Sequence, residues 1–379
     1  MGIPEHNQEQ ISQRKICTTQ NHRKTYPAAG VVALCVLLAL ASISARNLSI
    51  PIRFINSLPT KTTALSGSES SSISHAGSII QYLKEEPQPE TGAFTLPASY
   101  SRLVVLVSGS SVGDAAVTVD VGTTNESHVV FATSSDRKSA QKLTKVFPVL
   151  SADNTTLSVH VVFPAFKKKK QQKQLPKTLH TDLRITLPQS LVFFEMASAP
   201  RAAASLLWNG PDVALSFSVV VNVGSIRTHS PLNSAAIAIS TAVGSISAFN
   251  AVHANLLDLR ADAGGISLSE NAYVAGAAHL HTNTGSITGS LHEFTSLDVS
   301  VHSGSVALSL YPGISDAIAK VWAKTGSISL DSYGFIGTYS ARTEIGAVKV
   351  GGSNVHRLTG NTGWVGSPEG QGIVEASTN

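Results

Sequence analysis

The sequence contains only two cysteines and few charged residues. Both cysteines, Cys17 and Cys35, lie near the N-terminus of the 379-residue chain. No disulfide can therefore brace the rest, so a disulfide scaffold is excluded and the main domain must be held by apolar burial and backbone pairing. Charged residues make up 14% of the chain, while Gly, Ser, Ala, Val and Leu are plentiful. This composition favours a β-rich protein over a helical bundle.

The basic charge is modest and concentrated in one place. The formal net charge is +4, and many basic residues lie in the run Lys167–Lys170, Lys173 and Lys177. Such a run could bind nucleic acid or an acidic glycan. We favour an exposed insertion loop, since most charge runs are solvated. The topology inferred below excludes nucleic acid as a partner.

One uncharged apolar stretch, residues 27–45, lies near the N-terminus. Its length as a helix is roughly 28 Å, about one hydrocarbon core. The sequence therefore predicts a cytoplasmic tail over residues 1–26 and a single transmembrane helix over 27–45. The alternative is a cleaved signal peptide, because Ala39-Leu40-Ala41 has the small-x-small form of a cleavage site. The long polar leader favours the uncleaved anchor.

The flanks of this stretch predict its orientation. Four basic residues precede it and two follow closely, which favours a cytoplasmic N-terminus: Arg14, Lys15, Arg23 and Lys24, then Arg46 and Arg53. The C-terminal bulk is then expected to be extracellular or lumenal. Sequons at Asn125 and Asn154 agree and are predicted glycosylation sites, whereas Asn47 lies too near the span. The polar C-terminus predicts no cleaved lipid-anchor signal.

Beyond the span the composition changes twice. Residues 46–97 include a Ser/Thr/Gly-rich segment that cannot bury enough apolar surface to fold, which predicts a flexible stalk. Residues 98–190 contain alternating apolar runs separated by Gly, Asp and Asn, which predict a β-rich region interrupted by the lysine run. Residues 367–379 are predicted to be a polar tail.

Residues 191–366 carry an internal repeat. A glycine stands two residues before a buried Ile or Val, and we call the latter the anchor. The anchors are Ile226, Ile246, Ile266, Ile287, Val306, Ile328, Val348 and Val365, at steps of 20, 20, 21, 19, 22, 20 and 17 residues. The glycines are Gly224, Gly244, Gly264, Gly285, Gly304, Gly326, Gly346 and Gly363. Fixed columns at this period indicate stacked coils rather than an antiparallel sandwich, whose turn signals come every 8 to 12 residues.

The columns predict an all-β fold, a β-solenoid of eight coils with two or three sheets. The residue seven positions before each anchor is always apolar, and the strand there alternates, so the anchor and this position face a shared core. Each glycine is expected to relieve a corner, through a positive φ or a close backbone approach. The short last step and Trp364 suggest that the last coil is a cap. Residues 190–211, with Ala204 and Leu206, are predicted to be a degenerate coil at the other end.

The repeated strand, Gly-Ser-Ile, strand pattern resembles a known family. Together with its lead-in from Leu183 to Pro188, it is similar to the "putative adhesin" β-solenoid domain described in bacteria and fungi. The resemblance covers residues 180–366, about half of the chain. It implies a structural module of the cell surface or envelope, and it supplies no catalytic residues.

The outward columns contain the candidate ligand-binding residues. Eight, six and four positions before the anchors, polar residues recur on consecutive coils; the candidate face is Asp258, Arg260, His279, His281, Asp298, Trp322 and Lys324. This strip could bind a glycan or an anionic surface, with Trp322 as a stacking platform. The alternative, which we favour from sequence alone, is a solvated face whose opposite charges stabilise modestly.

The sequence shows no motif for catalysis or cofactor binding. The carboxylates of the strip are interleaved with His, Arg and Asn, no Ser lies in a Gly-x-Ser-x-Gly context, and Gly109–Gly113 lacks the lysine of a phosphate loop. Asp258, His279 and Asp298 could bind a metal in principle, but a flat ladder disfavours it. We therefore predict no metal and no cofactor.

These patterns lead to one hypothesis with two rivals. The hypothesis is a non-catalytic, single-pass membrane protein that displays a β-solenoid on a stalk, acts in cell-surface structure or adhesion, and has a cell-surface glycan or protein as its partner. The rivals are a polysaccharide-active β-helix enzyme and a secreted protein released by signal cleavage.

Overall fold

The computed structural model describes residues 91–365, with gaps at 97–99, 110–112, 124–125, 137–143, 165–178, 188–190, 249, 270, 312–314, 334–335, 353–354 and 360–361. The described residues form 25 β-strands and no helix, which confirms the predicted all-β class. No helix among them is long and apolar enough to cross a membrane. The predicted transmembrane segment, the lysine run and the polar tail lie outside the described residues.

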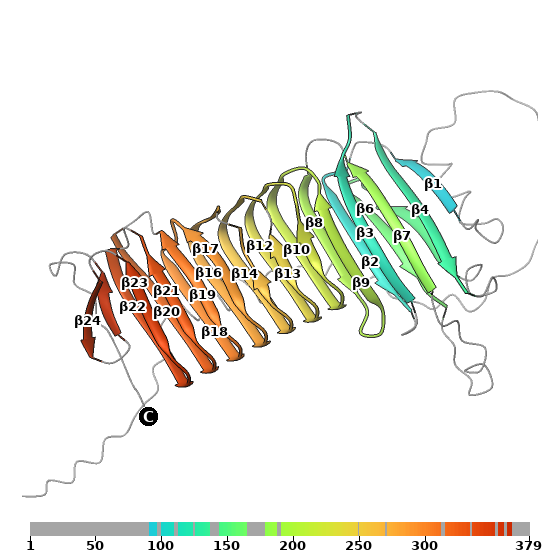
Figure 1. Ribbon diagram of the computed structural model, residues 1–379. Helices are drawn as coiled ribbons and strands as arrows, with labels where there is room; N and C mark the ends of the chain where they lie inside the picture. The colour runs from blue at the N-terminus through green and yellow to red at the C-terminus, as the bar shows by residue number, and fades with distance from the viewer. Residues whose placement is uncertain are drawn as a thin grey trace, which may run out of the picture. The chain divides into compact units, whose positions relative to one another are not determined.

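Seven coils form the C-terminal part, each from a longer strand followed by a shorter one (Figure 1). They are β10 (Val213–Val223) with β11 (Ile226–Thr228), β12 (Leu232–Val243) with β13 (Ile246–Ala248), β14 (Val252–Ala263) with β15 (Ile266–Ser267), β16 (Ala272–Thr284) with β17 (Ile287–His292), β18 (Ser296–Ser303) with β19 (Val306–Tyr311), β20 (Ser315–Thr325) with β21 (Ile328–Ser332), and β22 (Ile336–Ile345) with β23 (Val348–Gly352). Each strand pairs in parallel with its counterpart in the next coil.

The register confirms the predicted columns. The anchors from Ile226 to Val348 are direct cross-coil partners, and those from Ile226 to Ile328 are at most 1% exposed. The glycines from Gly224 to Gly346 all have φ between +138° and +149°. A Cβ on any of them would lie within 2.1 Å of a carbonyl oxygen on the preceding coil. Both predicted reasons for glycine therefore act at every corner.

The predicted eighth coil is absent, and Gly363 is not a corner glycine. It lies within β25 (Thr362–Val365), which pairs antiparallel with β22 and with β24 (Val355–Thr359). The 17-residue step leaves too little chain for another circuit, so the chain reverses and closes the stack as a hairpin. The interpretation of this segment as a cap is confirmed.

The other end of the stack begins before residue 191. In the predicted degenerate coil, β8 (Leu191–Ser198) and β9 (Ala203–Asn209) pair with β10 and β11, and Leu206 is opposite Ile226. Next come β2 (Arg102–Ser108) and β3 (Gly113–Val121), and then β6 (Thr156–Val162) and β7 (Leu179–Leu187). The order of these coils is thus not the order of the sequence.

Antiparallel strands close this end too. β5 (Lys145–Leu150) pairs with β6, and β4 (Ser127–Ser135) pairs with β7 and with β1 (Thr91–Leu96). β1 lies inside the segment predicted as a stalk, and its Phe94 ring stacks on Phe131 at 5.7 Å. The β structure therefore begins earlier than the sequence indicated, because β1 pairs with β4 over its whole length and buries Leu96.

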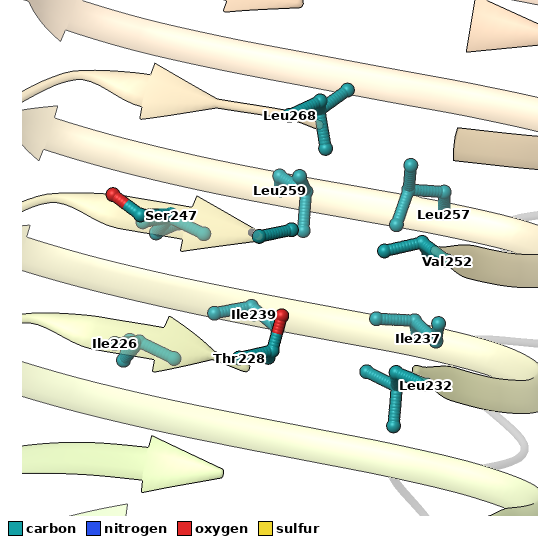
Figure 2. A pocket seen from close by; sticks show the side chains of 12 residues that line it. Ile226, Thr228, Leu232, Ile237, Ile239, Ser247, Val252, Leu257, Leu259 and Leu268 are labelled. Carbon is teal, nitrogen blue, oxygen red and sulfur yellow. The ribbon is translucent and has the colours of Figure 1, made fainter. Parts of the chain in front are cut away.

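The interior of the coils is filled by side chains from three sides. Figure 2 shows Leu232 and Val252 from the start of the longer strands, Ile237 and Leu257 from beyond a bend in them, and Ile226 from a shorter strand, around one small cavity. This cavity measures about 10 Å³, barely enough for one water. The bend shows in the burial pattern of β14, where His253 and Asn255 are exposed before it and Arg260 after it. The outer surface is therefore the place for ligand contacts.

Candidate binding surface

The predicted polar strip lies on the outer face beyond the bend. Direct cross-coil partners form one column of Asp258, His279, Asp298 and Lys320, and a second of Arg260, His281, Ser300, Trp322 and Arg342. Lys324 follows Trp322 by two residues on β20, so it shares the same face. All seven predicted residues are partly or fully exposed. The structure therefore brings the predicted strip together.

Three members of the strip are held by neighbouring side chains. The Arg260 guanidinium donates to both carboxylate oxygens of Asp258, at 2.9 and 3.0 Å. This hydrogen bonding and the Asp258 charge raise the pKa of Arg260 above its ordinary value. His281 Nδ1 and Ser300 Oγ lie 2.7 Å apart. Because Asp258 is engaged by Arg260, it is not a free carboxylate.

No group of three His, Cys, Asp or Glu side chains in the described part of the chain is arranged to hold a metal ion. Asp258 and Asp298 lie two coils apart with His279 between them, a separation of about 9.5 Å at the usual strand spacing.

Trp322 is the centre of a basic cluster, which we define as Lys320, Trp322, Lys324 and Arg342. The indole is half-buried on the outer face, with Ser300 before it and Arg342 after it in its column. Lys320 and Lys324 flank it on its own strand. The three cations form no ion pair within the described residues. The cluster thus places an aromatic ring beside three cations, with Asp298 as the cross-coil partner of Lys320.

An aromatic ladder, not predicted from the sequence, lies on another side of the same coils. Its rings are His253 of β14, Tyr273 of β16, His292 of β17, Tyr311 of β19 and Tyr333 directly after β21. Neighbouring ring centroids are 4.4 to 4.9 Å apart, about the spacing of paired strands. In the sequence the ladder corresponds to a His or a Tyr every 19 to 22 residues. Because the residue type varies and the spacing from the corner glycines is not constant, the glycine repeat does not reveal it.

A surface concavity of about 360 Å³ lies beside the start of this ladder. It is lined by Ser234, Ala235, His253, Ala254, Asn255, Tyr273, Ala275 and Glu293. Two local irregularities accompany it. The register between β14 and β16 shifts by one residue after Ala254, and Glu293 has a positive φ of 62°. Sequence reasoning missed this site, although the 21-residue step from Ile266 to Ile287 was a sign of the extra residue.

The two predicted glycosylation sequons differ in their surroundings. Asn154 is exposed at the tip of the β5–β6 hairpin, with φ 56°. Asn125 lies outside the described residues. Ser127 of its sequon is fully buried and hydrogen-bonds Tyr100 Oη at 2.5 Å. The structure therefore leaves Asn154 open to a bulky modification in the folded state.

No family model and no curated protein matches the chain. Similar solved structures are a "putative adhesin" from Bacteroides fragilis NCTC 9343 (14% identity, TM-score 0.34, covering 70% of this chain and 96% of that one) and a "putative adhesin" from Parabacteroides distasonis ATCC 8503 (11%, 0.29, 70% and 98%). Another is a "putative cell adhesion protein" from Clostridium sporogenes ATCC 15579 (8%, 0.25, 70% and 100%). The neighbours thus carry adhesin-like descriptions.

Proposed function

We propose that this chain is a non-catalytic, membrane-anchored surface protein whose β-solenoid binds an acidic glycan of a cell surface or matrix. The basic cluster around Trp322 carries the proposal. A half-buried indole beside three cations without ion pairs matches a ligand that has both sugar rings and negative charge. Parallel pairing on both sides of β20 fixes these side chains relative to one another. Such preorganisation reduces the entropic cost of binding.

Binding is tested with the full-length protein on an array of acidic and neutral glycans. Trp322→Ala is expected to weaken acidic-glycan binding about tenfold, because a ring contact with the sugar is lost. The double variant Lys320→Gln/Lys324→Gln is expected to weaken it about tenfold or more, because two charge-assisted contacts are lost. Added salt should weaken it further. The control is the double variant Arg227→Gln/Lys349→Gln, which removes two positive charges from the shorter strands and should leave binding intact. If both double variants lost the same affinity, net charge alone would explain the effect, and the assignment of the site to the basic cluster would be contradicted.

The proposed location rests on the apolar segment 27–45 and its basic flanks. A full-length chain with a C-terminal epitope should be labelled on intact cells by a non-permeant antibody. Asn154→Gln should remove a glycan, seen as a mobility shift that glycosidase treatment reproduces. Mass spectrometry of the mature N-terminus separates the anchor from the secreted alternative. A mature start near Ser42 would rule out the anchor.

The proposal that the strip is not catalytic has its own test. The protein is incubated with a panel of polysaccharides and reducing ends are measured, with Asp258→Asn and Asp298→Asn as variants. We expect no turnover by any of the three proteins. Turnover that depends on either aspartate would establish the enzyme alternative.

A further inference from the structure

The concavity beside the aromatic ladder is built by a specific irregularity in one coil. β16 has one residue more than β14 at the bend, so Ala275 and Gly276 bulge opposite Asn255. Gly276 permits this, because a Cβ there would lie 2.3 Å from the Asn255 carbonyl oxygen. Bulges of this kind re-aim side chains and are concentrated beside functional sites. Ala235 and Ala275 line the depression from its outer side, so small side chains leave its volume open.

A strained residue forms the far wall. Glu293 follows β17 with φ 62°, a region that residues other than Gly, Asn and Asp seldom adopt. Its N–H donates to the Tyr311 carbonyl oxygen at 2.8 Å, which holds this conformation. Glu293 lines the concavity, and its carboxylate forms no ion pair with the described residues. The backbone thus holds a free carboxylate at the edge of an open depression.

The ladder supplies the remaining wall and limits what can bind. Tyr273 has His253 against one face at 4.8 Å and His292 against the other at 4.7 Å. With both faces covered, it cannot form the aromatic cage that recognises an ammonium group, since that interaction needs a ring face. His253 is the terminal ring of the ladder, so one of its faces is not stacked on a ring. The Tyr273 phenol and the His253 imidazole are therefore expected to act as polar contacts.

From this arrangement we infer that the concavity is a second binding site, for a neutral sugar unit of a polysaccharide. One carboxylate, one carboxamide, one phenol and one imidazole surround an alanine-lined depression. Together they accept and donate hydrogen bonds as a polyol requires. The volume of about 360 Å³ is within the range of small-molecule sites. An acidic sugar is disfavoured, because Glu293 is the only acid or permanently charged residue in the lining.

The test uses the full-length protein and isothermal titration calorimetry with four probes. Cellotetraose and mannotetraose represent neutral oligosaccharides, tetragalacturonate an acidic one, and spermidine a cation. We expect at least one neutral probe to bind. Glu293→Gln should weaken that binding about tenfold, since a hydrogen bond to a charged group is lost. Ala275→Trp, at an exposed position, should abolish it by filling the depression.

Two controls separate this site from folding and from the basic cluster. Ala307→Trp places the same side chain at an exposed position on β19 and should bind like the parent protein, and circular dichroism checks that every variant is folded. Trp322→Ala should leave the neutral probe bound, so this inference and the proposed acidic-glycan site can fail separately. The inference is overturned if neither neutral probe binds, if only spermidine or tetragalacturonate binds, or if folded Ala275→Trp still binds the neutral probe.

Discussion

At the scale of single residues, the corner glycine is the most constrained position in each coil. It combines a positive φ with a backbone approach that leaves no space for a Cβ. The residue after it is different: Gly265 occupies a position where other coils carry Ser225, Ser245 and Ser286. Adjacent positions therefore have opposite tolerance, although both are glycine in this coil.

Gly264→Ala and Gly265→Ser form a matched pair. Gly264→Ala should lower the free energy of unfolding by about 3 kcal/mol or more, because the strained φ and the clash with the Gly244 carbonyl oxygen act together. Gly265→Ser should change it by less than about 1 kcal/mol, because serine fits the equivalent corners. Urea denaturation followed by circular dichroism measures both. Similar losses would show that the corner as a whole, and not its φ, is the constraint.

Buried threonine hydroxyls also divide into two kinds. Thr282 Oγ1 donates to the Gly264 carbonyl oxygen at 2.9 Å, and Thr241 and Thr343 make the same bond on other coils. Thr228 is 2% exposed, and its hydroxyl has no hydrogen-bond partner among the described residues. Thr228 lines the small interior cavity. Among the residues that line this cavity, Ser247 has the only other hydroxyl, and this hydroxyl points away from the cavity (Figure 2). A bridging water would therefore lack partners.

Replacement by valine should separate the two kinds. Thr228→Val keeps the shape and removes an unsatisfied hydroxyl, so stability should stay the same or rise by up to about 1 kcal/mol. Thr282→Val breaks a hydrogen bond and should cost about 1–2 kcal/mol. Thermal and urea unfolding of both variants are compared with the parent. Destabilisation by Thr228→Val would mean that its hydroxyl is satisfied in solution.

At the scale of elements, cross-coil pairs give the sheet its side-chain stacking. The aromatic ladder is one such set, and its members differ in the number of rings that they stack on. Tyr273 stacks on two rings, whereas Tyr333 stacks on Tyr311 at 4.9 Å and is 52% exposed. Each pair is worth about 0.5–1.5 kcal/mol beyond the buried area.

Tyr273→Ala should therefore cost at least twice as much stability as Tyr333→Ala, about 2–4 against about 1 kcal/mol. Tyr273→Phe keeps the stack without the hydroxyl and should lie close to the parent. Urea denaturation midpoints rank the three. Equal effects of the two alanine variants would show that stacking along the ladder adds nothing to burial.

The sequence predicted the repeating coils and the β structure of residues 98–190, but it did not predict how the strands of that region pair. The glycine and anchor columns fixed the coils from β10 to β23 because one residue type recurs at one corner. The parallel pairing of β2 with β6 has no such column. The two strands lie more than 40 residues apart in the sequence, and the other parallel neighbour of β2 is β8. The polar strip followed from strand alternation. The concavity did not, because one extra residue and the φ of Glu293 create it.

At the scale of the molecule, parallel coils leave unpaired backbone groups at both ends of the stack, which invite pairing with other chains. The described residues carry antiparallel strands at both ends, β1, β4 and β5 on β6 and β7 at one end and the β24–β25 hairpin on β22 at the other. Pro148 in β5 adds protection, because proline cannot donate to a further strand. The caps thus limit the number of coils.

Each coil in this stack pairs with its two neighbours, so its stability is a local sum of its own and nearest-neighbour terms. Opening should then start at a weakened coil and spread only as far as coupling between neighbours carries it. Gly264→Ala weakens a central coil, and Gly346→Ala imposes the same clash on the last one, with a Cβ 1.9 Å from the Gly326 carbonyl oxygen. In hydrogen–deuterium exchange of the full-length protein, Gly346→Ala should lower protection in β20–β23 and leave β10–β13 unchanged. Gly264→Ala should lower protection in the coils on both sides of β14. A uniform loss across all coils in both variants would instead mean that the stack unfolds as one cooperative unit.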